Sequence, residues 1–146
     1  MQTTETKHPD MRKIVSALTA KIDVKEIANL VRDKVKKRID TGKNYDGSAM
    51  TPLKAKTIAI KRKQGGVKPS SPLIFKGGTQ KGIQAQTVSK KEALVVSSGT
   101  AKGYYGSGIS SKEVLGYQKK QGRDPMAISK EDVQDVIKLV KKQLGR

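Results

Sequence analysis

The sequence predicts an α+β fold in which a long N-terminal helix and a C-terminal helix pack on a small antiparallel β-sheet. Three observations support this: apolar residues recur at helical spacing over residues 24–40 and 130–144, residues 79–98 alternate like a β-hairpin, and a long basic, loop-rich segment separates the first helix from that hairpin. The chain has 146 residues, the usual size of one domain. We place this domain at residues 11–146, after a flexible polar tail at residues 1–10.

The N-terminal helix is predicted over residues 24–40. Residues 11–20 form either a short helix of their own or the upstream part of this one. Asp23 and Glu26 have the spacing of a capping box, in which each side chain accepts a hydrogen bond from a free backbone amide at the helix start. Gly42 is a natural residue to end the helix. The apolar stripe comprises Ile27, Ala28, Val31, Val35 and Ile39.

We call residues 46–78 the basic segment. They lie in the region of the chain where basic residues most outnumber acidic ones. The formal net charge is +18, and from residue 47 to residue 91 there is no acidic residue but ten lysines or arginines. Such an excess repels itself unless an anionic partner neutralises it. Nucleic acid, an acidic protein ring and a membrane surface are the partner classes that fit, and a basic surface without a specific partner is the remaining interpretation.

Turn and helix signals give the basic segment fixed points. Residues 43–47 predict a turn, and Thr51 followed by Pro52 is a typical helix start, so we predict a short, exposed helix over residues 52–63. A flexible loop is expected at residues 67–71. The loop ends at an apolar anchor of Pro72, Leu73, Ile74 and Phe75, and we expect Phe75 to be buried.

After the basic segment, the hairpin is predicted to turn at residues 89–92. Residues 99–111 are rich in glycine and serine and predict a loop, with or without a short third strand beside it. The pair Tyr104 and Tyr105 in this loop either covers the end of the sheet or stacks on nucleic-acid bases.

Two further helices are expected before the end of the chain. Residues 110–113 have a capping pattern that predicts a short helix ending near Gly122. After a turn, Ser129 is expected to cap the C-terminal helix, and Gly145 is expected to end it.

Residues with catalytic or metal-binding chemistry are few and scattered. There is no cysteine, and the single histidine, His8, lies in the polar tail, so neither a zinc site nor a serine–histidine–aspartate arrangement is expected. Asp46, Glu92 and Asp124 are carboxylates without a predicted capping role, and nothing in the sequence brings them together. No glycine-rich phosphate-binding motif occurs. We therefore expect a protein that is not an enzyme and that holds no cofactor and no metal.

The sequence also predicts where the chain is made. No apolar run is long enough to span a membrane, and the N-terminus lacks the pattern of a signal peptide. We therefore expect a protein that is made in the cytoplasm and does not enter a membrane.

Several short motifs follow one another in a fixed order along residues 24–144. A helix is followed by DG-x4-PL, a lysine-rich T-x3-K segment, PLI-x2-G, strands, a Gly-Arg turn and a helix capped by S-x-E-D. In their order and spacing these motifs resemble the virion-morphogenesis or tail-completion proteins of tailed bacteriophages. The matching residues are Asp46, Gly47, Pro52, Leu53, Thr57, Lys61, Pro72, Leu73, Ile74, Gly77, Gly122, Arg123, Ser129, Glu131 and Asp132.

This resemblance implies a structural virion protein of the phage neck, made in the host cytoplasm. It would form a homo-oligomeric ring of six that completes the tail and joins it to the head connector around the DNA channel. The implied partners are copies of the same chain, other neck and tail proteins, and DNA in the channel, contacted without sequence recognition. The residues expected to act as structural anchors are Asp46, Gly47, Pro52, Leu53, Pro72, Leu73 and Phe75.

Basic residues of the central region are the candidates for contact with a partner or with DNA. A small basic protein that acts alone and binds nucleic acid without sequence specificity is the alternative function. The candidate contact residues are Lys54, Lys56, Lys61, Arg62, Lys63, Lys68, Lys76 and Lys81.

Overall fold

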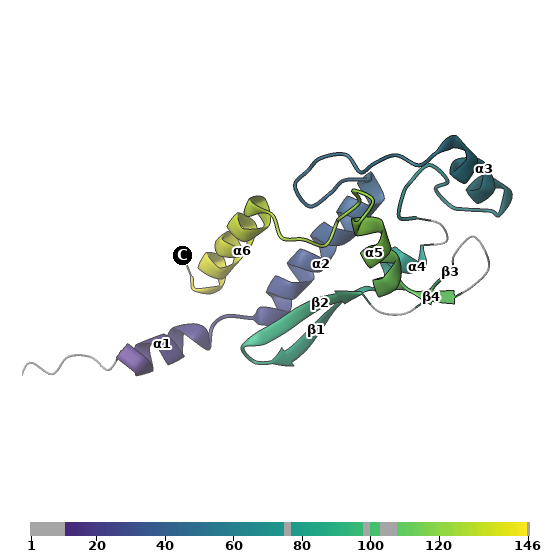
Figure 1. Ribbon diagram of the computed structural model, residues 1–146. Helices are drawn as coiled ribbons and strands as arrows, with labels where there is room; N and C mark the ends of the chain where they lie inside the picture. The colour runs from purple at the N-terminus through teal and green to yellow at the C-terminus, as the bar shows by residue number, and fades with distance from the viewer. Residues whose placement is uncertain (1–10, 75–76, 98–99, 103–107, 146) are drawn as a thin grey trace, which may run out of the picture.

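The computed structural model of the chain has a mixed α+β fold, which confirms the predicted class (Figure 1). It describes residues 11–74, 77–97, 100–102 and 108–145. The predicted tail with His8, and the residues Phe75, Lys76, Tyr104 and Tyr105, lie outside the described residues.

The described helices are α1 (Met11–Thr19), α2 (Val24–Thr41), α3 (Ala55–Lys63), α4 (Gly78–Lys81), α5 (Ser111–Lys119) and α6 (Lys130–Gln143). Strands β1 (Ile83–Ser89) and β2 (Glu92–Ser97) form the predicted antiparallel hairpin, with Ile83 opposite Ser97. Strands β3 (Thr100–Lys102) and β4 (Gly108–Ser110) form a second, shorter antiparallel pair where a loop with at most one strand was expected.

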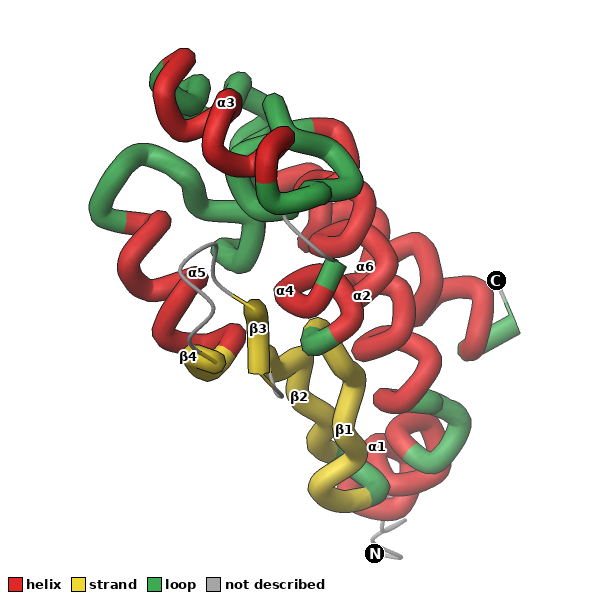
Figure 2. The backbone as a smooth tube through the Cα atoms, turned by 90° about the vertical axis from the view of Figure 1, so that its right-hand side faces the viewer, coloured by secondary structure: helices red, strands yellow, loops and turns green. Residues whose placement is uncertain are grey.

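Helix α2 is central to this arrangement and lies between the β1–β2 hairpin and α6 (Figures 1 and 2). Helix α6 therefore packs along α2, whereas the prediction placed it on the sheet. The core forms around the C-terminal half of α2, where Val35 and Ile39 are fully buried. The side chains packed with these two are Met50, Leu73, Ile74, Ile83 and Leu115, with Val95 and Met126 at the edge of the cluster.

The N-terminus of α2 is capped by a nearby side chain and by a residue distant in the sequence. Asp23 caps the helix as predicted, because its side chain accepts from the amides of Lys25 and Glu26 at 2.9 and 3.2 Å. The second predicted bond of this cap, from the Asp23 amide to the Glu26 side chain, is replaced by a bond to Gln143. Gln143, at the end of α6, accepts from the Asp23 amide at 3.1 Å, donates to the Asp23 carbonyl at 3.2 Å, and donates to Glu26 at 2.8 Å. These bonds make α2 and α6 antiparallel neighbours.

Two predicted element boundaries are wrong, each for a tertiary reason. The helix predicted over residues 52–63 begins at Ala55, because Arg123 holds the carbonyl oxygens of Thr51 and Pro52, which could otherwise serve as the first acceptors of that helix. Residues 78–81, expected at the edge of the first strand, form the short helix α4 instead.

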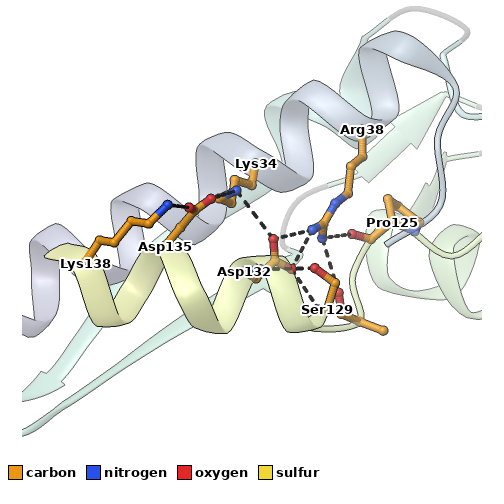
Figure 3. Close-up of polar contacts among 8 residues, drawn as sticks. Lys34, Arg38, Pro125, Ser129, Asp132, Asp135 and Lys138 are labelled. Atoms are coloured by element: carbon orange, nitrogen blue, oxygen red, sulfur yellow. Dashed lines mark hydrogen bonds and ion pairs between the residues drawn. The ribbon is translucent and has the colours of Figure 1, made fainter. Parts of the chain in front are cut away.

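A buried ion pair joins α2 to the start of α6 (Figure 3). One guanidinium nitrogen of Arg38 donates to both carboxylate oxygens of Asp132, which is 1% exposed. The other nitrogen donates to the carbonyls of Pro125 and Ala127, each at 3.2 Å. Ser129 completes the capping box, since its hydroxyl accepts from the Asp132 amide at 3.1 Å and its amide donates to the Asp132 carboxylate at 2.9 Å.

These contacts decide the protonation of Asp132. Burial acts to raise the pKa of this carboxyl, but the hydrogen bonds from Arg38 and Ser129, together with the charge of Arg38, hold its pKa below the usual value of 3.8. A carboxyl with a lowered pKa stabilises the fold above its unfolded-state pKa and loses that contribution as pH falls through the folded-state pKa. The link between α2 and α6 is therefore intact at neutral pH and weakens in acid below about pH 4.

Replacing Asp132 tests this link. Asp132→Asn removes the charge that Arg38 faces in a buried site, so we expect a loss of roughly 3 kcal/mol in the free energy of unfolding, measured in urea at pH 7. Asp135→Asn is the matched control on the same helix, because Asp135 pairs with Lys34 and Lys138 near the surface and little change is expected. Equal losses in the two variants would contradict a special role for the Arg38 pair.

Candidate interaction surface of the basic segment

The basic segment leaves the core at one point and returns to it at another. Met50, just before α3, and Leu73 and Ile74, after the following loop, are buried in the core cluster. Between these points α3 and its loop extend to one side of the molecule, beyond the end of α2 (Figure 1). Leu73 and Ile74, which belong to the predicted apolar anchor, thus lie in the core, and the residues between Met50 and Leu73 form an excursion from the body of the molecule.

Arg123 fastens the start of this excursion. Its side chain is 6% exposed and donates from Nε to Thr51 O at 2.7 Å and from Nη2 to Pro52 O at 3.1 Å. Nη1 donates to the side-chain oxygens of Gln118 and Gln121 at 2.6 and 3.0 Å. Each of these four acceptors is uncharged, so the hydrogen bonds leave the charge of the guanidinium unneutralised.

The backbone around Arg123 strengthens the same attachment. The amide of Tyr45 donates to Asp124 O at 2.8 Å, and the Asp124 amide donates to Asn44 Oδ1 at 2.8 Å. Gly122 has φ of +77°, and a Cβ at this position would lie 2.6 Å from Thr51 Oγ1. Only glycine allows this close approach to Thr51 and this positive φ without strain. Gly122 and Arg123 together therefore bring the turn after α5 into close contact with the segment before α3.

Lys61 is buried, which changes its predicted role as a contact residue. It is 4% exposed, and its amino group donates to Ser71 O at 2.6 Å, across the loop that follows α3. Burial, helped by the nearby charge of Arg123, lowers its pKa from 10.5 to about 8. Lys61 therefore closes the loop from inside and is not available to a partner on the surface.

The other candidate cations differ in exposure and in their partners. Lys54, Lys56, Arg62 and Lys63 are exposed, and their side chains have no hydrogen bond or ion pair with any residue that the structure describes. Lys68 is paired with Asp40 of α2, and Lys81 is exposed at the end of α4. Lys76 is not among the described residues.

The predicted anchors lie at the two ends of the excursion. Asp46 accepts from the hydroxyl of Ser48 at 2.5 Å and from its amide at 3.0 Å, which lowers the pKa of Asp46 and closes a tight turn at Gly47, where φ is +83°. Pro52 contributes its carbonyl to Arg123, and Leu53 and Pro72 are half-buried.

The scattered carboxylates do not converge into a reactive site. Asp124 accepts from the amides of Met126 and Ala127, Asp46 from Ser48, and Glu92 is exposed at the hairpin turn. Within the described ranges no three histidine, cysteine, aspartate or glutamate side chains lie close enough to hold a metal ion. Likewise, none of the described helices combines the length and the apolar character needed to cross a membrane.

Sequence reasoning missed the roles of Arg38, Lys61 and Arg123. Lys61 had a usable signal, because it follows Ile58 by three residues and so shares the inward side of α3. The roles of Arg38 and Arg123 depend on partners 71 to 94 positions away, so no local spacing reveals them.

Comparison of the chain with models of protein families, with curated proteins and with solved structures gave no match.

The burial of Lys61 predicts a specific pH dependence. Because its pKa is lower in the folded chain, the unfolded chain binds more protons between pH 8 and 10.5, so folding stability rises with pH in that window. Relative to Lys61→Met, the wild type should gain up to about 3 kcal/mol in unfolding free energy from pH 7 to 10.5. The control is Lys63→Met, an exposed lysine on the same helix, whose difference from the wild type should not change with pH. A constant difference for Lys61→Met as well would overturn the assignment.

Arg123 is expected to hold α3 in place. Arg123→Lys keeps the charge but cannot reach Thr51, Pro52 and both glutamines at once, so we expect amide exchange in α3 to speed up roughly tenfold while exchange in β1 and β2 changes little. Native-state hydrogen exchange measures this, with Arg62→Lys on α3 as the control. Unchanged protection of α3 in Arg123→Lys would contradict the role.

Proposed function

We propose that this chain is a structural subunit of the tailed-phage neck, which forms a ring of six, completes the tail and joins it to the head connector around the DNA channel. The motif order along residues 24–144 supports the family and is the observation that carries the proposal. Apolar side chains that are exposed on two helices support assembly, since subunit contacts would bury them.

Exposed apolar residues on two helices indicate where such contacts would form. Helix α1 projects from the N-terminal end of α2, and its Val15 and Leu18 are exposed (Figure 1). On α6, Val133 and Ile137 are 47% and 41% exposed and lie four residues apart, on one side of the helix. Apolar residues grouped in this way on a monomer mark contact sites for other proteins.

In the proposed ring, the main part of each subunit is formed by α2 and the elements packed on it. The β1–β2 hairpin and α6 lie on two sides of α2, and α1 reaches beyond this main part toward a neighbour. Ring interfaces can be heterologous, which means that two different surfaces meet. In such an interface, α1 of one subunit can contact α6 of the next. The long, basic, loop-rich middle of the chain is then free to face the channel or an adjoining ring.

One observation favours the alternative of a basic nucleic-acid-binding protein that acts alone, namely the four unpaired cations around α3 among the described residues. Sedimentation of the purified chain at several salt concentrations separates the two functions. A monomer that binds DNA tightly and never enters virions supports the alternative, whereas incorporation into virions supports the proposed function.

Complementation of a tailed phage that lacks its copy of this gene tests the proposal. We expect such a phage to accumulate DNA-filled heads and separate tails, and the wild-type chain to restore joined particles. Val133→Asp should fail to restore them while keeping a folded chain, because it places a charge in the proposed subunit contact. Gln134→Asp, one residue along α6 and equally acidic, is the control and should restore them. Normal particles without the chain would refute the function.

A further inference from the structure

The surface around α3 carries exposed positive charge that nothing in the described chain neutralises. We define the α3 basic face as Lys56 and Lys63, which share one side of the helix, and the exposed Lys54 and Arg62 add positive charge around it. We propose that this face binds the phosphate backbone of double-stranded nucleic acid without reading its sequence. The inference rests on the proposed function, in which the chain surrounds a DNA channel, and it names the part of the chain that meets the DNA.

The distribution of ion pairs sets this face apart. The acidic residues that form ion pairs in the described chain are Asp33, Asp40, Asp124, Asp132 and Asp135. They lie on α2, on α6 or in the turn between α5 and α6. Most of them hold cations of α2 and α6, and the sequence supplies no carboxylate between residues 47 and 91. Positive potential therefore persists over α3, and an anionic partner would be drawn to it.

The interior beneath α3 does not offset this potential. Lys61, in α3, and Arg123, which binds the segment before α3, are both buried, and their hydrogen-bond acceptors are backbone carbonyls and glutamine side chains. Both buried cations therefore add to the field of the exposed ones. They also position the helix, because Arg123 holds the segment before α3 and Lys61 holds the loop after it.

The spacing of the exposed lysines suits an extended row of phosphates. Lys56 and Lys63 are seven residues apart, which places them on the same side of the helix and about 10 Å apart along its axis. Exposed Ala59 lies between them, so no bulky side chain keeps a backbone at a distance. Since phosphates of one strand follow each other at about 3.4 Å along the duplex axis, the two lysines can contact different phosphates.

The residue types favour nucleic acid over an acidic protein. The centres of protein interfaces are enriched in aromatic residues and depleted of lysine, whereas α3 has three lysines and no aromatic residue. The lack of aromatic side chains on α3 also argues against single strands, whose bases stack on such residues. Lysine and arginine contacts to phosphate position a protein on a duplex without specifying a sequence.

Duplex binding by matched variants tests the inference. The purified full-length chain is titrated into a fluorescent 30-base-pair duplex of mixed sequence across a series of salt concentrations. We expect Lys56→Gln with Lys63→Gln to weaken binding roughly tenfold at 0.1 M salt and to reduce the slope of log affinity against log salt by about 2. The control is Lys141→Gln with Lys142→Gln, the same charge change at exposed positions of α6, and its binding should change less than about twofold. Urea midpoints close to wild type for both variants show that the fold is kept.

Three outcomes would overturn the inference. The first is an equal loss in both double variants, which indicates diffuse charge and no defined face. The second is a wild-type chain that does not bind the duplex. The third is a loss of binding to poly-glutamate, used as the acidic-protein probe, that matches the loss for the duplex. Each of these leaves the complementation result for the neck function untouched, so failure here and failure of the proposed function are distinguishable.

Discussion

The guanidinium of Arg38 joins the three parts of the chain on which the rest of the structure depends. It binds Asp132 at the start of α6 and the carbonyls of Pro125 and Ala127 in the turn before it, while its own helix, α2, carries the core. That turn holds Asp124 against Asn44 and brings Arg123 to Thr51 and Pro52. A series of hydrogen bonds therefore connects the ion pair of Arg38 and Asp132 to the segment just before α3.

Half-buried Arg38 and buried Arg123 differ in the charge of the groups that they bind. Arg38 meets a carboxylate, so its charge is neutralised and the pair makes a rigid joint between α2 and α6. Arg123 and its neighbour Lys61 meet uncharged oxygens, so their burial costs free energy that no ion pair returns. Hydrogen bonds from Arg123 and Lys61 thus hold the two ends of the α3 region, together with the ion pair of Lys68 with Asp40 and the buried side chains of Leu73 and Ile74.

The distribution of charge and apolar surface agrees with the proposed place in a ring. Most of the ion pairs in the described chain involve cations of α2 and α6, while the exposed cations of α3 have no acidic partner among the described residues. Apolar side chains on α1 and α6 are exposed away from α3. A subunit built in this way has one region for neighbouring subunits and another for a polyanion, which is the division that a ring around DNA requires.

Much of the fold could be predicted from the sequence because the signals are local. Asp23 and Ser129 cap their helices, Gly42 ends α2, and the turn at residues 89–92 closes the first hairpin, each through partners a few residues away. The candidate surface was harder to predict. Exposed lysines were recognised as a group, but composition could not separate Lys61, which faces inward, from Arg62 and Lys63 beside it.

The sequence by itself determined the helices α2 and α6, the first hairpin, the α+β class and the large positive charge of the middle of the chain. Only the tertiary structure decided where α3 begins, that Gln143 replaces Glu26 in the cap of α2, and which cations remain exposed. The physical reason is the range of the interactions. Caps, turns and helical periodicity act over a few residues, whereas Arg38, Arg123 and Lys61 take their state from groups that only folding brings near.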